Sequence, residues 1–398
     1  MHSTHPACIE VQNPNHCTND GEPVARPVNR LLDPIQVGEL EFANRIVMAP
    51  LTRCRAAEGD VPTAMNARYY AQRATAGFII SEATNVSPRS CAFEKAPGIY
   101  SSAQVSGWKI VSDAVHAAGG RIFLQLWHGG RVGAEGILHG YAPLSPSGVN
   151  DDLTALHVWG QLANGRYVQI AATPSRAMTI DEIRDAIQEY RVGAANALSA
   201  GCDGVEVHAA NGYLPHQFLS PTTNRRDDEY GGSVANRARF LRQILENVAQ
   251  VVPMSRVGVR LSPFAAYNNV RDPNPHETYT YVTRMLQELG VAYIHVADTS
   301  ALVGGKDLPA ILDIVRPLYE GPLVANGGID PSAAEALVGS DKVQMVAFGR
   351  LFIANPDLPQ RVRLGLPLAQ PKALGWYGGN EEGYTDYPAY EPDPLTSV

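Results

Sequence analysis

The stretch Asp203–Tyr213, DGVEVHAANGY, indicates both the fold and the place of its chemistry. It opens with a short apolar run, Gly204–Val207, which has the length and valine content of a buried parallel strand. An imidazole, an amide and a phenol follow at once, those of His208, Asn211 and Tyr213. In parallel α/β proteins, the loops after the strands carry the active site. We therefore take these three side chains as the candidate catalytic residues.

The rest of the chain repeats the same pattern. Eight apolar runs end in polar residues or glycine, at 46–50, 78–83, 122–128, 204–208, 257–263, 293–298, 322–328 and 343–350. Segments with helical patterning follow them, at 64–76, 102–118, 180–200, 234–252, 276–289, 308–318, 331–338 and 357–364. Thr179 with Glu182 has the pattern of a capping box, and Asp330-Pro331 that of an N-cap before a proline at the first helical position. Strand–helix pairs in this number predict an α/β fold, the (β/α)8 TIM barrel.

Other segments lie outside the repeat. Residues 31–44, with Gly38-Glu39 at a turn, predict a hairpin that plugs the bottom of the barrel. Residues 129–178 follow the third strand and are rich in glycine, proline and serine, which predicts a long insertion that caps the site and contains a hairpin near 163–166. The domain assignment is therefore a disordered N-terminal extension at 1–27, the barrel at 28–388 and a C-terminal tail at 389–398.

Composition excludes several classes of partner. The chain of 398 residues is 45% hydrophobic, but it has no apolar run of the length that spans a membrane. Its net charge of −8, without a basic patch, argues against nucleic acid or an anionic membrane as partner. The five cysteines are scattered, which favours reduced thiols and a cytoplasmic protein. The histidines and cysteines of the first 17 residues do not have zinc-site spacing, so we expect no metal site.

Glycine-rich turns follow the last two predicted strands, at Asn326-Gly327-Gly328 and Gly349-Arg350. Turns in these two places commonly hold a phosphate in TIM barrels, because backbone N–H groups point at its oxygens. Arg350 adds a charged fork for the same oxygens. The alternative is a tight turn without a ligand. If a phosphate binds, it can belong to a sugar phosphate, pyridoxal phosphate or flavin mononucleotide (FMN).

Gln125 and Arg260 interrupt strands that are otherwise apolar. They either form structural pairs with a carboxylate such as Glu82 or Glu206, or they recognise a planar heterocycle at the barrel mouth. A flavin ring across the mouth would touch both Arg260 and Thr52. Pyridoxal phosphate would need a lysine at a strand end, and none of the eight predicted strand ends carries one.

From about residue 31 to 388 the chain resembles the old yellow enzyme family of FMN-dependent NAD(P)H ene-reductases. The resemblance rests on RIVMAPLTRCRA (45–56), SEAT (81–84), QLWHGGR (125–131), HAANGYLPHQFLSPTTNRRDDEYGGSVANRARF (208–240), VGVRLSP (257–263), AFGRLFIANPDLPQR (347–361) and YGGNEEGYTDYP (377–388). Thr52 stands where the thermophilic-like branch of the family has cysteine. The chain is therefore most similar to the classical branch, with its oxophytodienoate and pentaerythritol tetranitrate reductases.

The resemblance implies noncovalent FMN, with NADPH or NADH as reductant. The isoalloxazine ring would contact Ala49, Pro50, Leu51, Thr52, Ala83, Gln125 and Arg260, and the phosphate would contact Gly327, Gly349 and Arg350. The implied substrate is an α,β-unsaturated carbonyl compound, or a nitro compound, in a pocket walled by Thr52, Phe93, Trp127 and Tyr377. His208 and Asn211 would hold its oxygen, and Tyr213 would donate a proton. The implied assembly is a monomer or a homodimer.

Other functions are weighed against this one. A flavoprotein similar to dienoyl-CoA reductase would need clustered cysteines after the barrel, and no cysteine follows Cys202. A flavin-dependent isomerase is disfavoured by Tyr213, because a proton donor completes a reduction. A non-enzymatic FMN-binding or electron-transfer protein stays open, as does a sugar-phosphate aldolase on the same barrel.

Overall fold

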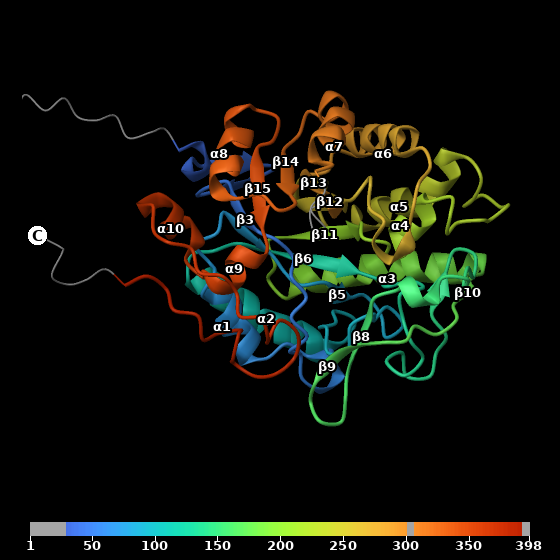
Figure 1. The fold of residues 1–398 in the computed structure, drawn as a ribbon. Coiled ribbons are helices and arrows are strands. Elements are labelled where there is room, and N and C mark those ends of the chain that lie inside the picture. Colours follow the sequence, from blue (N-terminus) through green and yellow to red (C-terminus); the bar gives the residue numbers. More distant parts are fainter. Residues whose placement is uncertain (1–28, 301–305, 392–398) are drawn as a thin grey trace, which may run out of the picture.

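The computed structural model describes residues 29–300 and 306–391 (Figure 1). The predicted extension at 1–27 and residues 392–398 of the predicted tail lie outside these ranges. Eight parallel strands form the barrel: β3 (Ile46–Met48), β4 (Phe78–Ile80), β6 (Ile122–Trp127), β11 (Gly204–Ala209), β12 (Val257–Leu261), β13 (Tyr293–Ala297), β14 (Leu323–Asn326) and β15 (Met345–Phe348). The pairings of β15 with β3 and of β6 with β11 close it. The predicted (β/α)8 barrel is confirmed.

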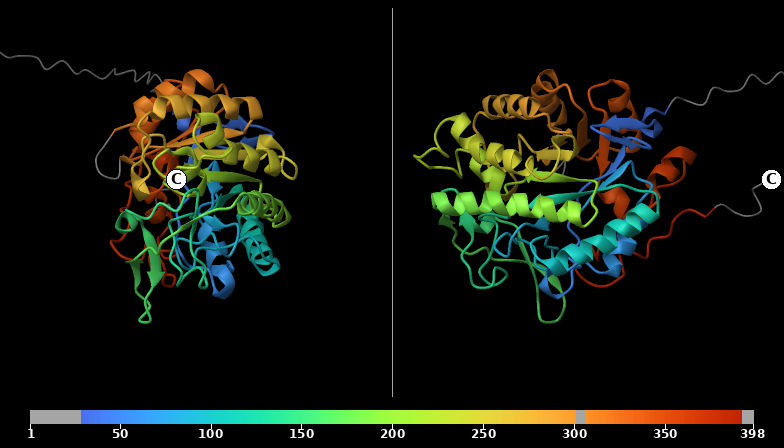
Figure 2. Two further views of the ribbon diagram at one scale, coloured as in Figure 1. Left: turned by 90° about the vertical axis from the view of Figure 1, so that its right-hand side faces the viewer. Right: turned by 180° about the vertical axis from the view of Figure 1, so that it is seen from behind.

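Helices cover the outside of the barrel (Figure 2). The long or regular ones are α1 (Ala64–Ala71), α2 (Ser102–Ala117), α3 (Ile180–Ser199), α5 (Val234–Val248), α6 (Pro275–Leu289), α7 (Leu308–Val315), α8 (Pro331–Gly339) and α10 (Leu358–Leu364). The capping box of Thr179 and Glu182 and the N-cap of Asp330 are both present. The helices predicted at 64–76 and 234–252 end earlier in the structure, α1 by five residues and α5 by four. Hydrogen-bonded turns follow each helix, and their residues continue the helical pattern of the sequence.

A hairpin plugs the bottom of the barrel, as the sequence predicts. Its strands β1 (Ile35–Val37) and β2 (Leu40–Phe42) pair antiparallel across a turn at Gly38, which has the left-handed φ of +57°. The ring of Phe42 packs on Phe78 at 4.8 Å and on Phe123 at 6.3 Å between ring centres. Both partners lie at the start of barrel strands, so the hairpin seals the end opposite the candidate catalytic loop.

The segment after β6 forms the predicted insertion. It contains β7 (Leu144–Ser145), which pairs with β10 (Arg176–Ala177), and an antiparallel hairpin of β8 (Val158–Gln161) and β9 (Tyr167–Ile170). Residues 162–166 form the turn of that hairpin, where the sequence predicts one. A short strand, β5 (Thr84–Asn85), adds to the edge of β6. In the described part of the chain, no helix combines the length and apolar character that crossing a membrane requires.

Candidate active site

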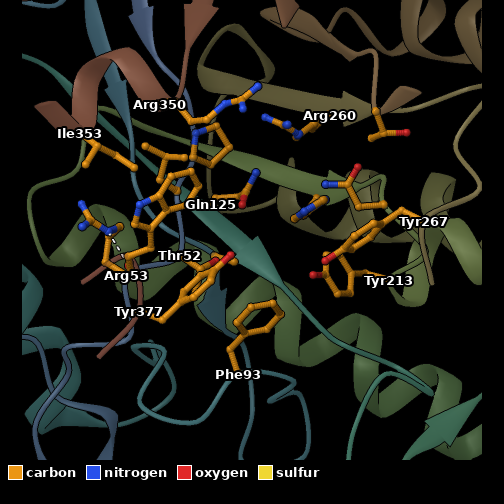
Figure 3. A pocket seen from close by; sticks show the side chains of 17 residues that line it. Thr52, Arg53, Phe93, Gln125, Tyr213, Arg260, Tyr267, Arg350, Ile353 and Tyr377 are labelled. Carbon is orange, nitrogen blue, oxygen red and sulfur yellow. Dashed lines mark hydrogen bonds between the residues drawn. The ribbon is translucent and has the colours of Figure 1, made fainter. Parts of the chain in front are cut away.

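Two cavities, which share several wall residues, lie at the C-terminal ends of the barrel strands. The first has a volume of about 290 Å³ and the second of about 410 Å³. Of the residues proposed from the sequence, those that line the first cavity only are Thr52, Ala83, Phe93, Gln125, His208, Tyr213 and Tyr377. Those that line the second only are Ala49, Gly327 and Gly349, and those that line both are Pro50, Leu51, Asn211, Arg260 and Arg350. Figure 3 shows the first cavity.

Trp127 lies behind the wall of the first cavity and not on it. Its side chain is fully buried, and its ring meets that of Tyr213 edge-on, with 5.1 Å between ring centres. It also packs on Phe93 at 5.9 Å. Trp127 therefore packs on two residues that do face the cavity, and its contact with substrate stays a prediction.

His208 is a neutral hydrogen-bond donor. Its ring lies at the end of β11 and is 4% exposed. Burial, with the nearby positive charge of Arg260, holds the pKa of His208 well below its usual range. Nδ1 accepts from the backbone N–H of Ala210 at 3.3 Å, so the ring proton sits on Nε2. The site therefore presents an uncharged imidazole N–H toward a ligand.

Asn211 and Tyr213 lie in the turn that follows β11. Asn211 adopts a left-handed φ of +57°, and its backbone N–H donates to Oγ of Ser262 at 2.8 Å while its carbonyl accepts from Asn268 at 2.9 Å. Its side-chain oxygen is buried and has no hydrogen-bond partner among the described residues. Tyr213 then forms the N-cap of α4 (Leu214–Leu219). Burial raises the pKa of Tyr213 well above its usual range, so its phenol keeps its proton.

The side chains of Gln125 and Arg260 are both buried at the mouth. Gln125 donates to Glu206 at 2.7 Å, so the carboxylate pair that the sequence leaves open does form. Arg260 instead donates to His295 at 3.1 Å and to Asn326 at 2.9 Å. Glu82, the other carboxylate considered, accepts from the backbone of Arg53 and Cys54 and is not part of this contact.

The second cavity has a backbone-lined end suited to a phosphate. Gly327 has a φ of +146°, and a side-chain carbon there would lie 2.6 Å from Cβ of Asp298, so only glycine fits. Gly349 precedes the short helix α9 (Arg350–Ala354), whose first residue Arg350 lines both cavities. A polar cradle for a ring edge and a glycine cradle for a phosphate therefore adjoin, and this arrangement fits FMN.

Sequence reasoning missed several residues of the wall, namely Arg53, Tyr267, Thr299, Ile353 and Trp376. Tyr267 lies beside Tyr213 in Figure 3 and stacks on His157 of the insertion, with 4.6 Å between ring centres. Arg53 binds the C-terminal segment through the carbonyl groups of Trp376 and Gly383. The motif RIVMAPLTRCRA contains Arg53 and could have indicated it as a site residue. No sequence pattern in the loop after β12 indicated Tyr267.

The chain is similar to known flavoproteins over most of its length. The model of the NADH:flavin oxidoreductase / NADH oxidase family matches residues 30–369. The 12-oxophytodienoate reductase 1 of Oryza sativa subsp. japonica is 39% identical, with 91% of this chain and 93% of the relative covered. The probable flavin mononucleotide-dependent alkene reductase of Leishmania infantum is also 39% identical, with coverage of 92% and 98%.

Solved structures agree with the sequence comparison. Morphinone reductase superimposes with a TM-score of 0.87 at 43% identity, covering 91% of this chain and 97% of that one. The old yellow enzyme homologue of Zymomonas mobilis gives a TM-score of 0.83 at 40% identity, with coverage of 90% and 99%. The chain therefore belongs to the NADH:flavin oxidoreductase / NADH oxidase family, the family of old yellow enzyme that its sequence resembles.

Proposed function

We propose that the barrel mouth is the active site of an FMN-dependent ene-reductase, which uses NADPH or NADH to reduce the C=C bond of α,β-unsaturated carbonyl compounds. Family membership supports FMN and a nicotinamide reductant. The observation that carries the site assignment is that His208, Asn211 and Tyr213 line one cavity with Gln125 and Arg260. Three hydrogen-bonding groups for a substrate and two for a heterocycle thus converge on one space.

The proposed cofactor contacts follow from the two cavities. Gln125 and Arg260 would hold the pyrimidine edge of the ring system, and Gly327, Gly349 and Arg350 would hold the phosphate. Ala49, Pro50, Leu51, Thr52 and Ala83 would contact the remaining ring surface. Bound FMN supplies the redox chemistry, a hydride taken from the nicotinamide and passed to the β-carbon of the substrate.

The substrate would be activated by the residues of the turn after β11. The Nε2–H of His208 and the side-chain amide of Asn211 donate to the substrate oxygen and stabilise the negative charge that grows there, as an oxyanion hole does. Tyr213 keeps its proton at neutral pH and gives it to the α-carbon. Phe93 and Tyr377 contact the rest of the substrate, and Trp127 packs on Phe93 from behind.

An isomerase without net reduction, or a protein that only stores FMN or passes its electrons to another protein, is the alternative. The proposed proton donor Tyr213, in a cavity that Phe93 and Tyr377 also line, favours a small-molecule reduction. This proposal also includes location in the cytoplasm, a monomeric or homodimeric state, and a barrel domain at 28–388 with 129–178 as its cap. These parts of the proposal rest on the sequence.

Anaerobic spectroscopy of the purified protein tests the function. We expect one yellow FMN per chain, bleaching by NADPH or NADH, and recovery of the oxidised spectrum when cyclohexenone is added. A colourless protein that does not take up FMN would refute the cofactor. A yellow protein that is bleached but not reoxidised by any enone would favour the electron-transfer alternative.

A further inference from the structure

Four polar side chains fill the centre of the barrel directly beneath the proposed ring site. The sheet register explains their meeting, because Gln125 of β6 pairs with Glu206 of β11, and Arg260 of β12 pairs with His295 of β13. Glu206 and His295 are 0% exposed, and Gln125 and Arg260 are 1% and 7% exposed. Glu206 joins the two pairs through a contact of 2.9 Å to Nδ1 of His295.

The position of each proton in this network follows from its members. An ionised carboxylate can only accept, so the contact of 2.9 Å between Glu206 and Nδ1 of His295 places the ring proton on Nδ1. Nε2 is then the acceptor of the ring; Nη1 of Arg260 lies 3.1 Å from Nε2 and 3.4 Å from Nδ1. Burial and the charge of Arg260 lower the pKa of His295, which agrees with a neutral ring.

Glu206 is the acceptor at the centre of the network. Burial alone would raise its pKa, but His295, Arg260 and Gln125 outweigh burial and hold the pKa below its usual value. A carboxylate has no proton to give, so the group of Gln125 that faces it at 2.7 Å is the amide NH₂. The amide oxygen of Gln125 is left for the cavity that this residue lines.

We propose that Glu206 and His295 are positioning residues for the cofactor, which fix the amide of Gln125 with its oxygen toward the ring and hold the guanidinium of Arg260 in place. The inference rests on the proposed FMN site and assigns a role to residues that line neither cavity. Gln125 then accepts from a ring N–H, while Arg260 donates to the ring carbonyl that gains negative charge on reduction.

Charge gives this arrangement a second consequence. Arg260 and Glu206 together carry no net charge, and the neutral His295 separates them. Replacing the carboxylate with an amide leaves the positive charge of Arg260 unopposed. Because that charge lies where reduction adds negative charge, the reduced cofactor is stabilised more than the oxidised one.

Glu206→Gln in the holoenzyme tests both consequences. The substituted amide lets Gln125 turn over and leaves a ring N–H without its acceptor, so we expect FMN to bind about 10- to 100-fold more weakly, the usual cost of a buried polar group left unpaired. Dye-equilibration should show a reduction potential more positive than that of the wild type. Asp203→Asn is the matched control, because Asp203 is a buried acid that precedes the same strand at the other end of the barrel. It should change neither quantity.

A pair of substitutions at His295 gives an independent reading if Glu206→Gln does not fold. His295→Gln keeps one donor and one acceptor and should retain FMN affinity better than His295→Leu, which leaves both Arg260 and Glu206 without this partner. If the wild type binds FMN, either of two results would overturn this inference but leave the proposed function standing. One is an FMN affinity and a reduction potential that are both unchanged in Glu206→Gln, and the other is an equal FMN affinity of the two His295 variants. A wild type that binds no FMN would overturn the proposed function as well.

Discussion

The ring of Tyr213 stands edge-on to the imidazole of His208, with ring centres 4.9 Å apart and ring planes inclined by 79°. The two residues belong to the end of β11 and to the turn after it, so one short stretch of chain places the proposed proton donor beside a proposed ligand of the substrate oxygen. Both side chains are uncharged at neutral pH, since burial lowers the pKa of His208 and raises that of Tyr213, so one presents an N–H and the other an O–H. This pairing makes the oxygen-binding role testable apart from the proton-donating role.

Phenols should bind at His208 and Asn211 and produce a long-wavelength charge-transfer band with FMN. A phenolate oxygen carries the negative charge that the site is proposed to stabilise, and it lies next to an aromatic ring that can stack. The double substitution of His208→Ala with Asn211→Ala should abolish the band. The FMN content of the variant is the control and should stay near that of the wild type. A band that persists would mean that another group holds the ligand oxygen.

Arg55→Met should weaken enone binding without loss of FMN. Arg55 donates to the carbonyl groups of Asn380 and Gly375, both at 2.9 Å, and lies over the ring of Tyr384. These contacts hold the segment that carries Tyr377 against the first cavity. Their loss should raise KM for an enone by about 10-fold, the order expected for lost hydrogen bonds to a charged group.

The control for Arg55 is Arg68→Met, which removes another arginine that contacts the same C-terminal segment. Arg68 contacts Glu381 at 3.4 Å, but both side chains are more than half exposed, and such surface pairs contribute little. We expect an unchanged KM for this variant. Equal effects of the two substitutions would show that the C-terminal segment does not position the substrate.

Acid should destabilise the fold through buried neutral histidines. Burial lowers the pKa of His128 to about 3 and that of His216 to about 4, and it lowers those of His208 and His295 as well. The unfolded chain takes up protons at its histidines below pH 6.5 and the folded chain does not, so the free energy of unfolding falls as the pH drops through about 6.5. Each such histidine contributes up to about 1.4 kcal/mol per pH unit in that range.

Urea denaturation between pH 7.5 and 5 measures this dependence. Burial raises the pKa of Glu189 to about 7, which acts with the opposite sign and offsets one histidine between about pH 4.3 and 7. His128→Asn should reduce the slope of the free energy of unfolding against pH by the contribution of one histidine, up to about 1.4 kcal/mol per pH unit. A free energy of unfolding that does not fall on acidification would contradict the neutral state of these four rings.

The sequence was sufficient for the barrel, because its strands depend on local patterns, while the family resemblance supplied most of the residues that line the two cavities. Each barrel strand is a buried apolar run, and the polar groups that follow it must lie at one end of a parallel barrel. The hairpin at the bottom could be predicted for the same reason, since Gly38 marks its turn. Short helices were missed. α4 and α9 have six and five residues, too few to show a helical period.

Contacts between distant segments were beyond sequence reasoning. The bond from Arg53 to the carbonyl of Trp376 spans 323 positions, and nothing near Arg53 indicates it. Tyr267 reaches the cavity through a turn in which Asn268 and Asn269 both have left-handed φ angles, and such a turn has no periodic signal. The link between Glu206 and His295 depends on the register of two strands that are not neighbours in the barrel.

Tyr213→Phe should separate the two halves of the catalytic cycle. The substitution removes one hydroxyl and keeps the ring, so the edge-on contacts with Trp127 and His208 remain. Reduction of FMN by NADPH needs no proton from this phenol and should proceed near the wild-type rate. Enone reduction should slow by about 10²- to 10⁴-fold, the usual contribution of a positioned general acid.

Stopped-flow traces of flavin reduction and of reoxidation by cyclohexenone measure the two halves of the Tyr213→Phe cycle separately. Quinones and nitro compounds, which can take protons from water, are the internal control and should reoxidise the variant at nearly the wild-type rate. Equal slowing of both halves would mean that Tyr213 holds the site together and does not donate the proton. Undiminished enone turnover would assign the proton to water or to another residue, and Tyr267, which also lines the first cavity, would then be the next to substitute.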